Sequence, residues 1–484
     1  MQLMPLDMNL LTIFKKKEKN LSMVNIGLLS LTSRNGTRLT TLLSEVKDLI
    51  RKRLYIRVEK YDNLIHEIPY IYLEATKVCP HLDVRVLLDP RKEINYQVFI
   101  GDNDVDEKNI AIKNFKEYKK PYDAVVIGGT FDRLHNGHKV LISTAILHAS
   151  KYVVTGVTRG DMNKKKILYE LMESFNDRKK GVDEFIEDVS IGIESRSEGI
   201  IDPFGPSIVD PNLQLIVTSE ETKKGGDIVN CKRKEKGLST LDTYVIPLID
   251  QADDILKEAK LSSSAKRRSL LGTILKEPSL KNIPSSPYII GITGGIASGK
   301  STIAEFLMAN NIEVIDCDKL AHILYDESEN LKKGIAKEFG DNVLNDNKID
   351  RKILGSIVFS DKNKLKKLNE IVWPKIAERA KEIIKKSKSP IIAIDGAVLL
   401  EANWDSFCHQ VWTVFVPREE AIQRVIKRNG LSEDEAIKRI DSQIGIEERL
   451  SKSNVALCSL WDKSETRRQV SLALETVKKC YIGK

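Results

Sequence analysis

The sequence predicts an α/β protein with two doubly wound parallel-sheet domains and a smaller α/β accessory domain in front of them. Two apolar runs, residues 122–127 and 288–292, each lead into a glycine-rich turn and then into a helix-like stretch. After each turn, apolar runs of strand length alternate with longer helical patterns. Because a strand, a crossover helix and a second strand form a parallel pair, this order indicates two open parallel sheets.

The length and composition are those of an ordinary globular chain without a membrane-spanning segment. With 484 residues the chain is long for one hydrophobic core, and its length suggests about three domains. Apolar residues make up 41% and charged residues 30%, and apolar runs such as 124–127 and 391–394 are far too short to cross a bilayer. The net charge of +8 suits anionic phosphate substrates and equally a lysine-rich solvated surface. We expect no nucleic-acid partner.

The cysteines and the N-terminus bear on the compartment. Six cysteines are scattered without a C-x-x-C pair, which argues against a disulfide framework or a zinc site and for a reducing compartment. The N-terminus lacks a signal-peptide pattern, since the apolar patch at 10–14 is very short and three lysines follow it. We therefore expect a cytoplasmic protein, with association to mitochondria left open.

Residues 1–120 form the predicted accessory domain. Strand-like runs lie at 25–31 and 84–88 and a helical stretch at 39–53, but no catalytic constellation is found there. Contact with a protein or a membrane surface is left open as its role. Residues 121–275 form the first catalytic domain, with a strand at 122–127, a helix at 137–149, strands at 151–157, 213–217 and 243–246, and a closing helix at 269–275.

A linker separates the two catalytic domains. Residues 276–287 contain three prolines and several serines, a composition typical of linkers. Residues 288–484 form the second catalytic domain. Its expected elements are strands at 288–292, 313–315, 391–394 and 411–416, a helix at 301–309 and terminal helices.

The first candidate site is the run G-G-T-F-D-R-L-H-N-G-H at residues 128–138. Gly129 ends a strand and permits a tight turn that brings main-chain N–H groups near a ligand, with the Thr130 hydroxyl beside it. His135 and His138 are three residues apart, so at a helix start they lie on one face. Two imidazoles at a helix N-terminus suit polyphosphate binding and stabilise charge on a transferring phosphorus. The pattern predicts nucleotidyl transfer from ATP.

This run closely resembles the phosphopantetheine adenylyltransferase branch of the nucleotidyltransferases. The resemblance implies that Thr130 and His138 act on the phosphates during catalysis. It also implies that Gly129 and His135 contribute to the ATP site.

Further segments resemble the same family. Residues 219–226, S-E-E-T-K-K-G-G, are similar to the V-S-E-E-T segment of the family. Residues 261–264, L-S-S-S, are similar to its phosphate-contacting loop. That loop implies ATP-phosphate contacts from Ser262, Ser263 and Ser264. Lys164 and Lys166 stand where the family places lysines for the acceptor phosphate, and the run K-K-K leaves open which lysine makes the contact.

Class I aminoacyl-tRNA synthetases are an alternative, because they share an H-x-G-H element and add a K-M-S-K-S loop. Residues 385–389, K-K-S-K-S, imitate that loop. They lie in the other predicted domain, at the polar end of a lysine-rich helix. We interpret them as a helix terminus before the strand at 391–394, and no anticodon-binding module is evident.

The second candidate site is the phosphate-binding loop G-G-I-A-S-G-K-S at residues 294–301. An apolar strand precedes it and an amphipathic helix follows, which is the context this motif requires. Lys300 is expected to reach the β- and γ-phosphates, and the Ser301 hydroxyl to hold Mg²⁺. Asp395 ends the apolar strand at 391–394 and is the second expected metal ligand. The residues expected to bind ATP here are Gly294, Gly295, Ile296, Ala297, Ser298, Gly299, Lys300, Ser301 and Thr302.

Residues beyond the loop favour a kinase over a GTPase. A GTPase would carry D-x-x-G and then N-K-x-D; residues 347–350 read N-K-I-D, but the polar residues before them do not form the buried strand that this motif follows. Asp318 follows the strand after the loop helix, where a carboxylate accepts a proton from a substrate hydroxyl. Arg424 and Arg428 lie four apart on one helical face, which suits a lid over ATP as well as an exposed charged face.

Residues 288–469 resemble the dephospho-coenzyme A kinases along nearly their whole length. The matching stretches include V-I-D-C-D at 314–318 and I-D-G-A-V-L-L-E at 394–401. The resemblance implies that Asp318 is the base for the ribose 3′-hydroxyl and that Arg351 contacts dephospho-CoA. It also implies ATP contacts from Arg428, Arg439 and Gln443. The chain departs from the stand-alone kinases at Trp373-Pro374, where they usually carry His-Pro.

An adenylyltransferase followed by a kinase is the order of the bifunctional coenzyme A synthases, a family that this chain resembles. The resemblance implies the last two steps of coenzyme A biosynthesis, with ATP, 4′-phosphopantetheine and dephospho-CoA as substrates and Mg²⁺ as cofactor. Two other classes stay open. One is a scaffold protein with decayed active sites, and the other is a P-loop kinase for a different small molecule.

Overall fold

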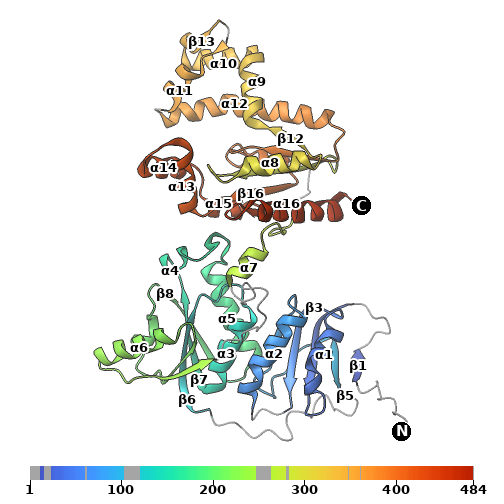
Figure 1. Cartoon of the computed structure of the whole chain (residues 1–484), viewed down its shortest axis with the longest axis vertical. Helices are drawn as coiled ribbons and strands as arrows, with labels where there is room; N and C mark the ends of the chain where they lie inside the picture. The colour runs from blue at the N-terminus through green and yellow to red at the C-terminus, as the bar shows by residue number, and fades with distance from the viewer. Residues whose placement is uncertain are drawn as a thin grey trace. The chain divides into compact units, whose positions relative to one another are not determined.

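The computed structural model describes residues 11–15, 23–59, 63–102, 120–246, 263–278, 283–346, 348–359 and 361–482. The chain divides into two compact units, Met1–Lys266 and Arg267–Lys484 (Figure 1). The first unit contains the predicted accessory domain and residues 121–266 of the predicted first catalytic domain. Among the described residues, no helix has the length and apolar character needed to span a bilayer.

The N-terminal sheet has the order β1-β5-β2-β3-β4, in which only the β1–β5 pair is antiparallel. Its strands are β1 (Leu11–Lys15), β2 (Val24–Leu31), β3 (Ile50–Val58), β4 (Asp83–Val86) and β5 (Val98–Asp102), and its helices are α1 (Leu39–Val46) and α2 (Leu64–Val78). The helix predicted at 39–53 is wrong in its second half. Helix α1 ends at Val46, and residues 50–53 already belong to β3, which further along buries Leu54, Ile56 and Val58 on one face and Tyr55 on the other.

The second sheet of the first unit is entirely parallel, with the order β10-β9-β6-β7-β8. The strands are β6 (Tyr122–Gly129), β7 (Ala149–Thr158), β8 (Glu194–Ile200), β9 (Leu215–Ser219) and β10 (Asp242–Ile246), and the helices are α3 (Asn136–His148), α4 (Asp161–Lys164), α5 (Phe175–Val189) and α6 (Lys223–Glu235). Chain order reverses between β6 and β9. Ligands of open parallel sheets bind at the carboxyl ends of the strands beside such a reversal.

The segment joining the units differs from the expected closing helix. The helix is α7 (Ser263–Ser269), and the chain after it runs along the second unit, where Leu275 donates to the Asn454 carbonyl at 2.7 Å. Gly272 has φ +80°, and a Cβ there would lie 2.3 Å from the Gln469 carbonyl oxygen. A helix through residue 272 is therefore excluded by both backbone conformation and packing.

The sheet of the second unit is also entirely parallel, with the order β12-β15-β11-β16-β17. Its strands are β11 (Tyr288–Gly294), β12 (Glu313–Asp316), β15 (Ile391–Asp395), β16 (Gln410–Phe415) and β17 (Val455–Cys458). Its helices are α8 (Lys300–Ala309), α9 (Cys317–Glu327), α10 (Glu329–Phe339), α11 (Arg351–Phe359), α12 (Lys362–Lys386), α13 (Arg418–Asn429), α14 (Glu433–Asp441), α15 (Ile446–Ser451) and α16 (Lys463–Val477). The doubly wound prediction is confirmed for both catalytic sheets.

Two motif look-alikes take the places that the sequence interpretation gave them. Residues 385–389 are the end of α12 and the loop before β15. Residues 348–349 form β14 (Lys348–Ile349), which pairs antiparallel with β13 (Leu344–Asn345) apart from the parallel sheet. Asn347 lies outside the described residues. Neither segment follows a buried parallel strand.

Two candidate nucleotide sites

The first site begins at the carboxyl end of β6, next to the reversal of chain order between β6 and β9. Thr130 is buried directly after the strand. Phe131 and Arg133 then adopt positive φ angles of 50° and 49°, which fold the loop back before α3 begins. Non-glycine residues adopt this conformation rarely, and they do so mostly where the surrounding structure holds them for function.

The two histidines of the motif lie face to face. The rings of His135 and His138 are stacked with their centroids 3.8 Å apart, and the Phe131 ring lies 5.3 Å from that of His138. A Cβ at Gly137 would lie 3.1 Å from the His135 ring, so a glycine is needed there for close approach. The Nδ1 atoms of both histidines are buried and make no hydrogen bond within the described residues. Both nitrogens are thus buried polar atoms whose hydrogen-bonding capacity is unused within the part of the chain that the structure describes.

The histidines are neutral at physiological pH. Burial, followed by the charges of Lys266 and Lys139, lowers the pKa of His135 to about 4. The pKa of His138 lies well below its ordinary range because of burial, then His135 and the charge of Lys166. A neutral imidazole has one donor and one acceptor nitrogen, and it gains affinity for a proton when an anion binds beside it.

His135 makes the free energy of unfolding depend on pH. Its pKa is about 4 in the fold and 6.5 ordinarily, so between these values the unfolded chain binds more protons. The free energy of unfolding is therefore expected to fall as the pH drops from 6.5 to 4. The total loss from this group is about 3 kcal/mol. Urea unfolding across this range should show a weaker pH dependence in His135→Gln. An identical dependence in both proteins would contradict the assignment.

Arg178 braces this loop and was missed by the sequence interpretation. It is buried on α5, and its guanidinium donates to the Thr130 carbonyl at 2.6 Å and to the Thr158 carbonyl at 2.9 Å. It thereby ties the loop after β6 to the end of β7. A single arginine on an amphipathic helix carries no motif, so nothing in the sequence indicated this role.

The predicted phosphate-binding lysines differ in their surroundings. Lys164 is exposed and pairs with Asp161 at 2.7 Å. Lys166 is half-buried, and its charge contributes to the lowered pKa of His138. Of the two lysines, Lys166 is therefore the one whose charge acts on the histidine pair.

The predicted serine loop reaches the same motif. Ser263, at the start of α7, donates from its hydroxyl to the Asp132 carbonyl at 3.1 Å, and Ser264 follows it half-buried. Ser262 lies outside the described residues. The glycines and serines around the motif thus come from two segments of the first unit that are about 130 residues apart, and the fold brings them together.

The second site is the loop between β11 and α8, at the centre of its sheet. Ala297 and Gly299 have φ angles of 60° and 89°, which turn the backbone N–H groups inward. The loop strand has neighbours on both sides, β15 and β16. Ser298 is buried, and its hydroxyl has no hydrogen bond within the described residues. Ser301 is exposed in the first turn of α8, and Thr302 follows it half-buried.

Lys300 forms an ion pair with Asp395, which ends β15. Burial raises the pKa of Asp395; Lys300 opposes this, and Asp316 and Asp318 add to it. The charges of Asp316 and Asp318 therefore act on the carboxylate that pairs with Lys300. Asp318 is exposed in the first turn of α9, where it is free of the ion pair and open to a substrate.

The loop is braced by groups from α13 and from beyond α14. Arg424 donates to the Ser459 hydroxyl at 2.8 Å and to its carbonyl at 2.7 Å, and Ser459 donates to the Ser298 carbonyl at 2.8 Å. Gln443 accepts a hydrogen bond from the Ile296 N–H at 2.8 Å. The Gln443 side chain therefore contacts the phosphate-binding loop directly.

The other predicted cations are exposed. Arg428 donates to Asn429 at 3.3 Å, and Arg439 lies on α14. Arg351, at the start of α11, bonds His322 and lies 3.8 Å from Asp326. These side chains are available to ligands, and their predicted roles remain predictions.

Arg449 is a second residue that the sequence interpretation missed. It is buried on α15 and donates to the Thr293 hydroxyl at 2.8 Å and the Ala397 carbonyl at 3.1 Å, while it pairs with Glu401 at 3.0 Å. It joins the end of β11 to the loop after β15. The end of β11, which leads into the loop before Lys300, and the end of β15, which carries Asp395, are thereby held together.

The fold and the sites define two classes of enzyme on one chain. A parallel sheet with a histidine pair at the first helix is the arrangement of a nucleotidyltransferase. A parallel sheet with a phosphate-binding loop, and a carboxylate on the adjoining strand, is the arrangement of a P-loop kinase. Residues 126–282 match the cytidylyltransferase-like family and residues 288–459 match the dephospho-CoA kinase family.

The relatives agree with the second match. Dephospho-CoA kinase of Carboxydothermus hydrogenoformans is 37% identical over 194 residues, which are 39% of this chain and 94% of that protein. The same enzyme of Lactobacillus johnsonii is 34% identical over 194 residues, 39% of this chain and 98% of that protein. That of Shouchella clausii is 38% identical over 189 residues, 38% of this chain and 96% of that protein. The chain belongs to the dephospho-CoA kinase family and carries a nucleotidyltransferase-like domain before it.

Proposed function

We propose that this chain converts 4′-phosphopantetheine to coenzyme A in two ATP-dependent steps. The observation that carries the proposal is the presence, on one chain, of a dephospho-CoA kinase domain behind a nucleotidyltransferase-like domain. An enzyme that supplies dephospho-CoA is the natural partner of one that consumes it. The first unit has the histidine pair and the second has the phosphate-binding loop.

In the first step, a phosphate oxygen of 4′-phosphopantetheine attacks the α-phosphorus of ATP, and the bond to pyrophosphate breaks. In this proposal His135 and His138 hydrogen-bond the ATP phosphates, which is supported by the unused hydrogen-bonding capacity of their buried Nδ1 atoms. The Thr130 hydroxyl and Lys166 stabilise the charge that builds on the transferring group. The acceptor is already a phosphate anion, so positioning and charge stabilisation suffice.

In the second step, the ribose 3′-hydroxyl of dephospho-CoA attacks the γ-phosphorus of ATP, and ADP leaves. Asp318 accepts the hydroxyl proton, since it is exposed at the start of α9. Lys300 exchanges its contact with Asp395 for the ATP phosphates. Arg428 and Arg439 from α13 and α14 neutralise charge as these helices close over ATP.

The residues around Lys300 fit a Mg²⁺ ion that arrives with ATP. Mg²⁺ bound to a nucleotide needs only one or two protein oxygens in addition to phosphates and water. Asp395 and the Ser301 hydroxyl would supply these oxygens. The negative charges of Asp316 and Asp318, which act on Asp395, favour a cation there. When bound, the ion would offset negative charge on the phosphates.

Gly294 is expected to be indispensable to the second site. A Cβ there would lie 2.5 Å from the Ser298 hydroxyl and 2.6 Å from the Val414 carbonyl oxygen, and the latter belongs to a sheet strand that cannot yield. Gly294→Ala should raise the KM for ATP in the kinase step about tenfold or more. Gly295→Ala is the matched control, since its Cβ would meet Gln443 at 3.5 Å, an ordinary contact. Equal effects of both variants in steady-state kinetics would contradict the steric argument.

Mass spectrometry of the products tests the proposed function. The full chain is incubated with Mg-ATP and 4′-phosphopantetheine, and dephospho-CoA is expected first, followed by CoA. Dephospho-CoA that accumulates without CoA would reject the kinase assignment and favour a different acceptor. A lack of both products would reject the first step, and dephospho-CoA supplied from outside would then test the second alone.

We also propose a cytoplasmic site of action. None of the six cysteines, which all lie among the described residues, forms a disulfide in the structure, which suits a reducing compartment. Cell fractionation would test this and would detect association with mitochondria, the alternative.

A further inference from the structure

The two sheets of the first unit share one hydrophobic core. A single cluster of buried apolar side chains includes Leu64, Ile68 and Ile71 of α2 together with Val140 and Ile142 of α3. Helices α2 and α3 lie side by side (Figure 1). Helix α2 of the N-terminal domain is thus packed against α3, the helix at the histidine pair.

The first residue of α3 is bonded to α2. The side-chain amide of Asn136 donates to the Tyr72 carbonyl at 3.2 Å and to the Thr76 hydroxyl at 2.8 Å. Asn136 lies between His135 and Gly137 in the H-N-G-H motif. The start of the motif helix is therefore anchored on the N-terminal sheet domain, not on its own sheet.

Lys139 makes a second anchor one turn along. Its ammonium group donates to the Asp83 carboxylate at 2.7 Å and to the Val84 carbonyl at 2.8 Å, and its side chain is only 4% exposed. Lys139 directly follows His138, and its backbone N–H donates to the His135 carbonyl at 3.1 Å. A shift of Lys139 would move both histidines.

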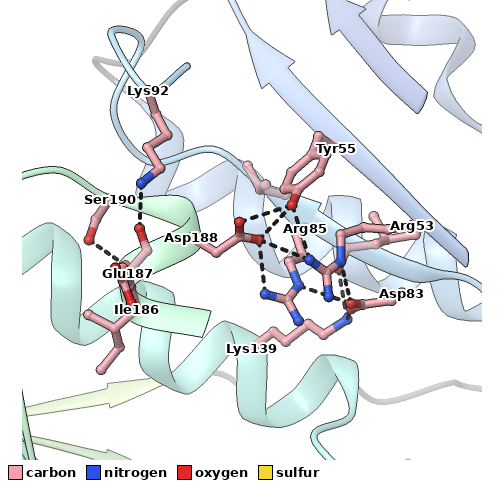
Figure 2. Close-up of polar contacts among 12 residues, drawn as sticks. Arg53, Tyr55, Asp83, Arg85, Lys92, Lys139, Ile186, Glu187, Asp188 and Ser190 are labelled. Atoms are coloured by element: carbon pink, nitrogen blue, oxygen red, sulfur yellow. Dashed lines mark hydrogen bonds and ion pairs between the residues drawn. The ribbon is translucent and has the colours of Figure 1, made fainter. Parts of the chain in front are cut away.

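Asp83 is the centre of a charge network that surrounds this anchor (Figure 2). Its other oxygen accepts from Arg53 at 2.8 Å and from Arg85 at 3.0 Å. Burial acts to raise the pKa of Asp83, but the three cations, Lys139 first, lower it to about 2. The carboxylate is therefore ionised at any pH at which the protein works. Burial lowers the pKa of the Lys139 ammonium group, and the charge of Asp83 opposes that shift.

The same network reaches the other helix of the site. Asp188, near the end of α5, accepts from Arg85 and from the Tyr55 hydroxyl, each at 2.9 Å (Figure 2). Helix α5 also carries Arg178, which braces the loop at Thr130. Both helices that shape the first site are thus held by strands β3 and β4 of the N-terminal sheet.

We propose that Asp83 and Lys139, with Asn136, position the histidine pair, so that the N-terminal sheet domain is a working part of the first active site. The inference rests on the proposed adenylyl transfer. Lys139 and Asn136 are positioning residues, because they touch the N-terminal domain and act through the adjacent histidines. The accessory domain thereby acquires a role in catalysis without contributing a group to the chemistry.

The main test is Lys139→Met, which keeps the apolar stem and leaves Asp83 with its two arginines. The expected result is a fall in kcat for dephospho-CoA formation of about 10- to 100-fold, with the KM for ATP nearly unchanged, because the histidines are misplaced rather than removed. The kinase step on the same chain should be unaffected and reports correct folding of the second unit. The matched control is Lys232→Met, which removes the 2.9 Å ion pair between Lys232 and Glu235 on α6, a contact that involves neither α3 nor α5.

Asn136→Ala is the second variant, should Lys139→Met lower the melting temperature of the first unit. It removes only the two bonds to α2 and should lower kcat in the same way. Nuclear magnetic resonance of the imidazole signals of His135 and His138 gives a readout that does not depend on the substrate. If the unaltered protein forms no dephospho-CoA, the proposed function is rejected. The imidazole signals would still show whether Lys139 and Asn136 position the histidines. Unaltered kcat, or unaltered ring signals, in both variants would overturn the inference.

Discussion

Replacement of Lys300 by alanine is expected to abolish 3′-phosphorylation of dephospho-CoA and to leave adenylyl transfer intact. Lys300 carries the only ammonium group that pairs with Asp395 among the described residues, at the start of the helix behind the phosphate-binding loop. Without it, charge on the transferring phosphoryl group is unopposed at that position. Loss of one such group from a water-excluded site lowers kcat by about 100- to 1000-fold. Mass spectrometry should then show dephospho-CoA accumulating from 4′-phosphopantetheine.

Lys375→Ala is the control for this variant. Lys375 pairs with Glu378 at 2.9 Å on α12, and the substitution removes a lysine of the same unit without touching the loop. It should leave both steps unchanged. Loss of both activities in Lys300→Ala, with an unchanged melting temperature, would contradict the model of two independent sites.

Replacement of His138 by alanine is expected to have the opposite effect. The ring of His138 stacks on His135 and has a buried, unbonded nitrogen, so its removal would delete a proposed phosphate-binding group and loosen the other histidine. The rate of dephospho-CoA formation should fall about 100- to 1000-fold. Dephospho-CoA supplied from outside should still be phosphorylated at the rate of the unaltered protein.

His66→Ala is the control, since His66 is exposed on α2 of the same unit. Activity measured with each substrate separately distinguishes the two steps. A His138→Ala variant that still forms dephospho-CoA at the normal rate would remove this histidine from the mechanism. A variant that lost the kinase step as well would show that the sites are coupled.

Local patterns located the positions of both loops and all strands of the catalytic sheets except β8 and β17. A parallel strand covered on both faces is a continuous apolar run, and β6, β11 and β15 are such runs. Both nucleotide loops follow their strands directly, so a motif and a strand place them at the carboxyl edge of a sheet. The edge strand β8 (Glu194–Ile200) was missed because its sequence, E-S-R-S-E-G-I, is polar.

Contacts between distant residues could not be predicted. Arg178 reaches Thr130 across 48 positions, and Arg449 reaches Thr293 across 156. Each is one arginine on an amphipathic helix, where a solvated charge is the ordinary interpretation. Their function depends on which carbonyl groups the fold brings to them, and no local period or spacing encodes that. The anchor between Lys139 and Asp83 belongs to the same class, 56 positions apart.

The shared core of the first unit has a consequence for how that unit folds. The boundary predicted at residue 120 separates two sheets, but the apolar side chains of α2 and α3 belong to one cluster. Neither half can therefore lose its structure without exposing the core of the other, and the two form one cooperative folding unit. Partial unfolding of the N-terminal sheet would therefore also disorder the histidine pair. The stability of the N-terminal sheet therefore limits how long the first site stays folded.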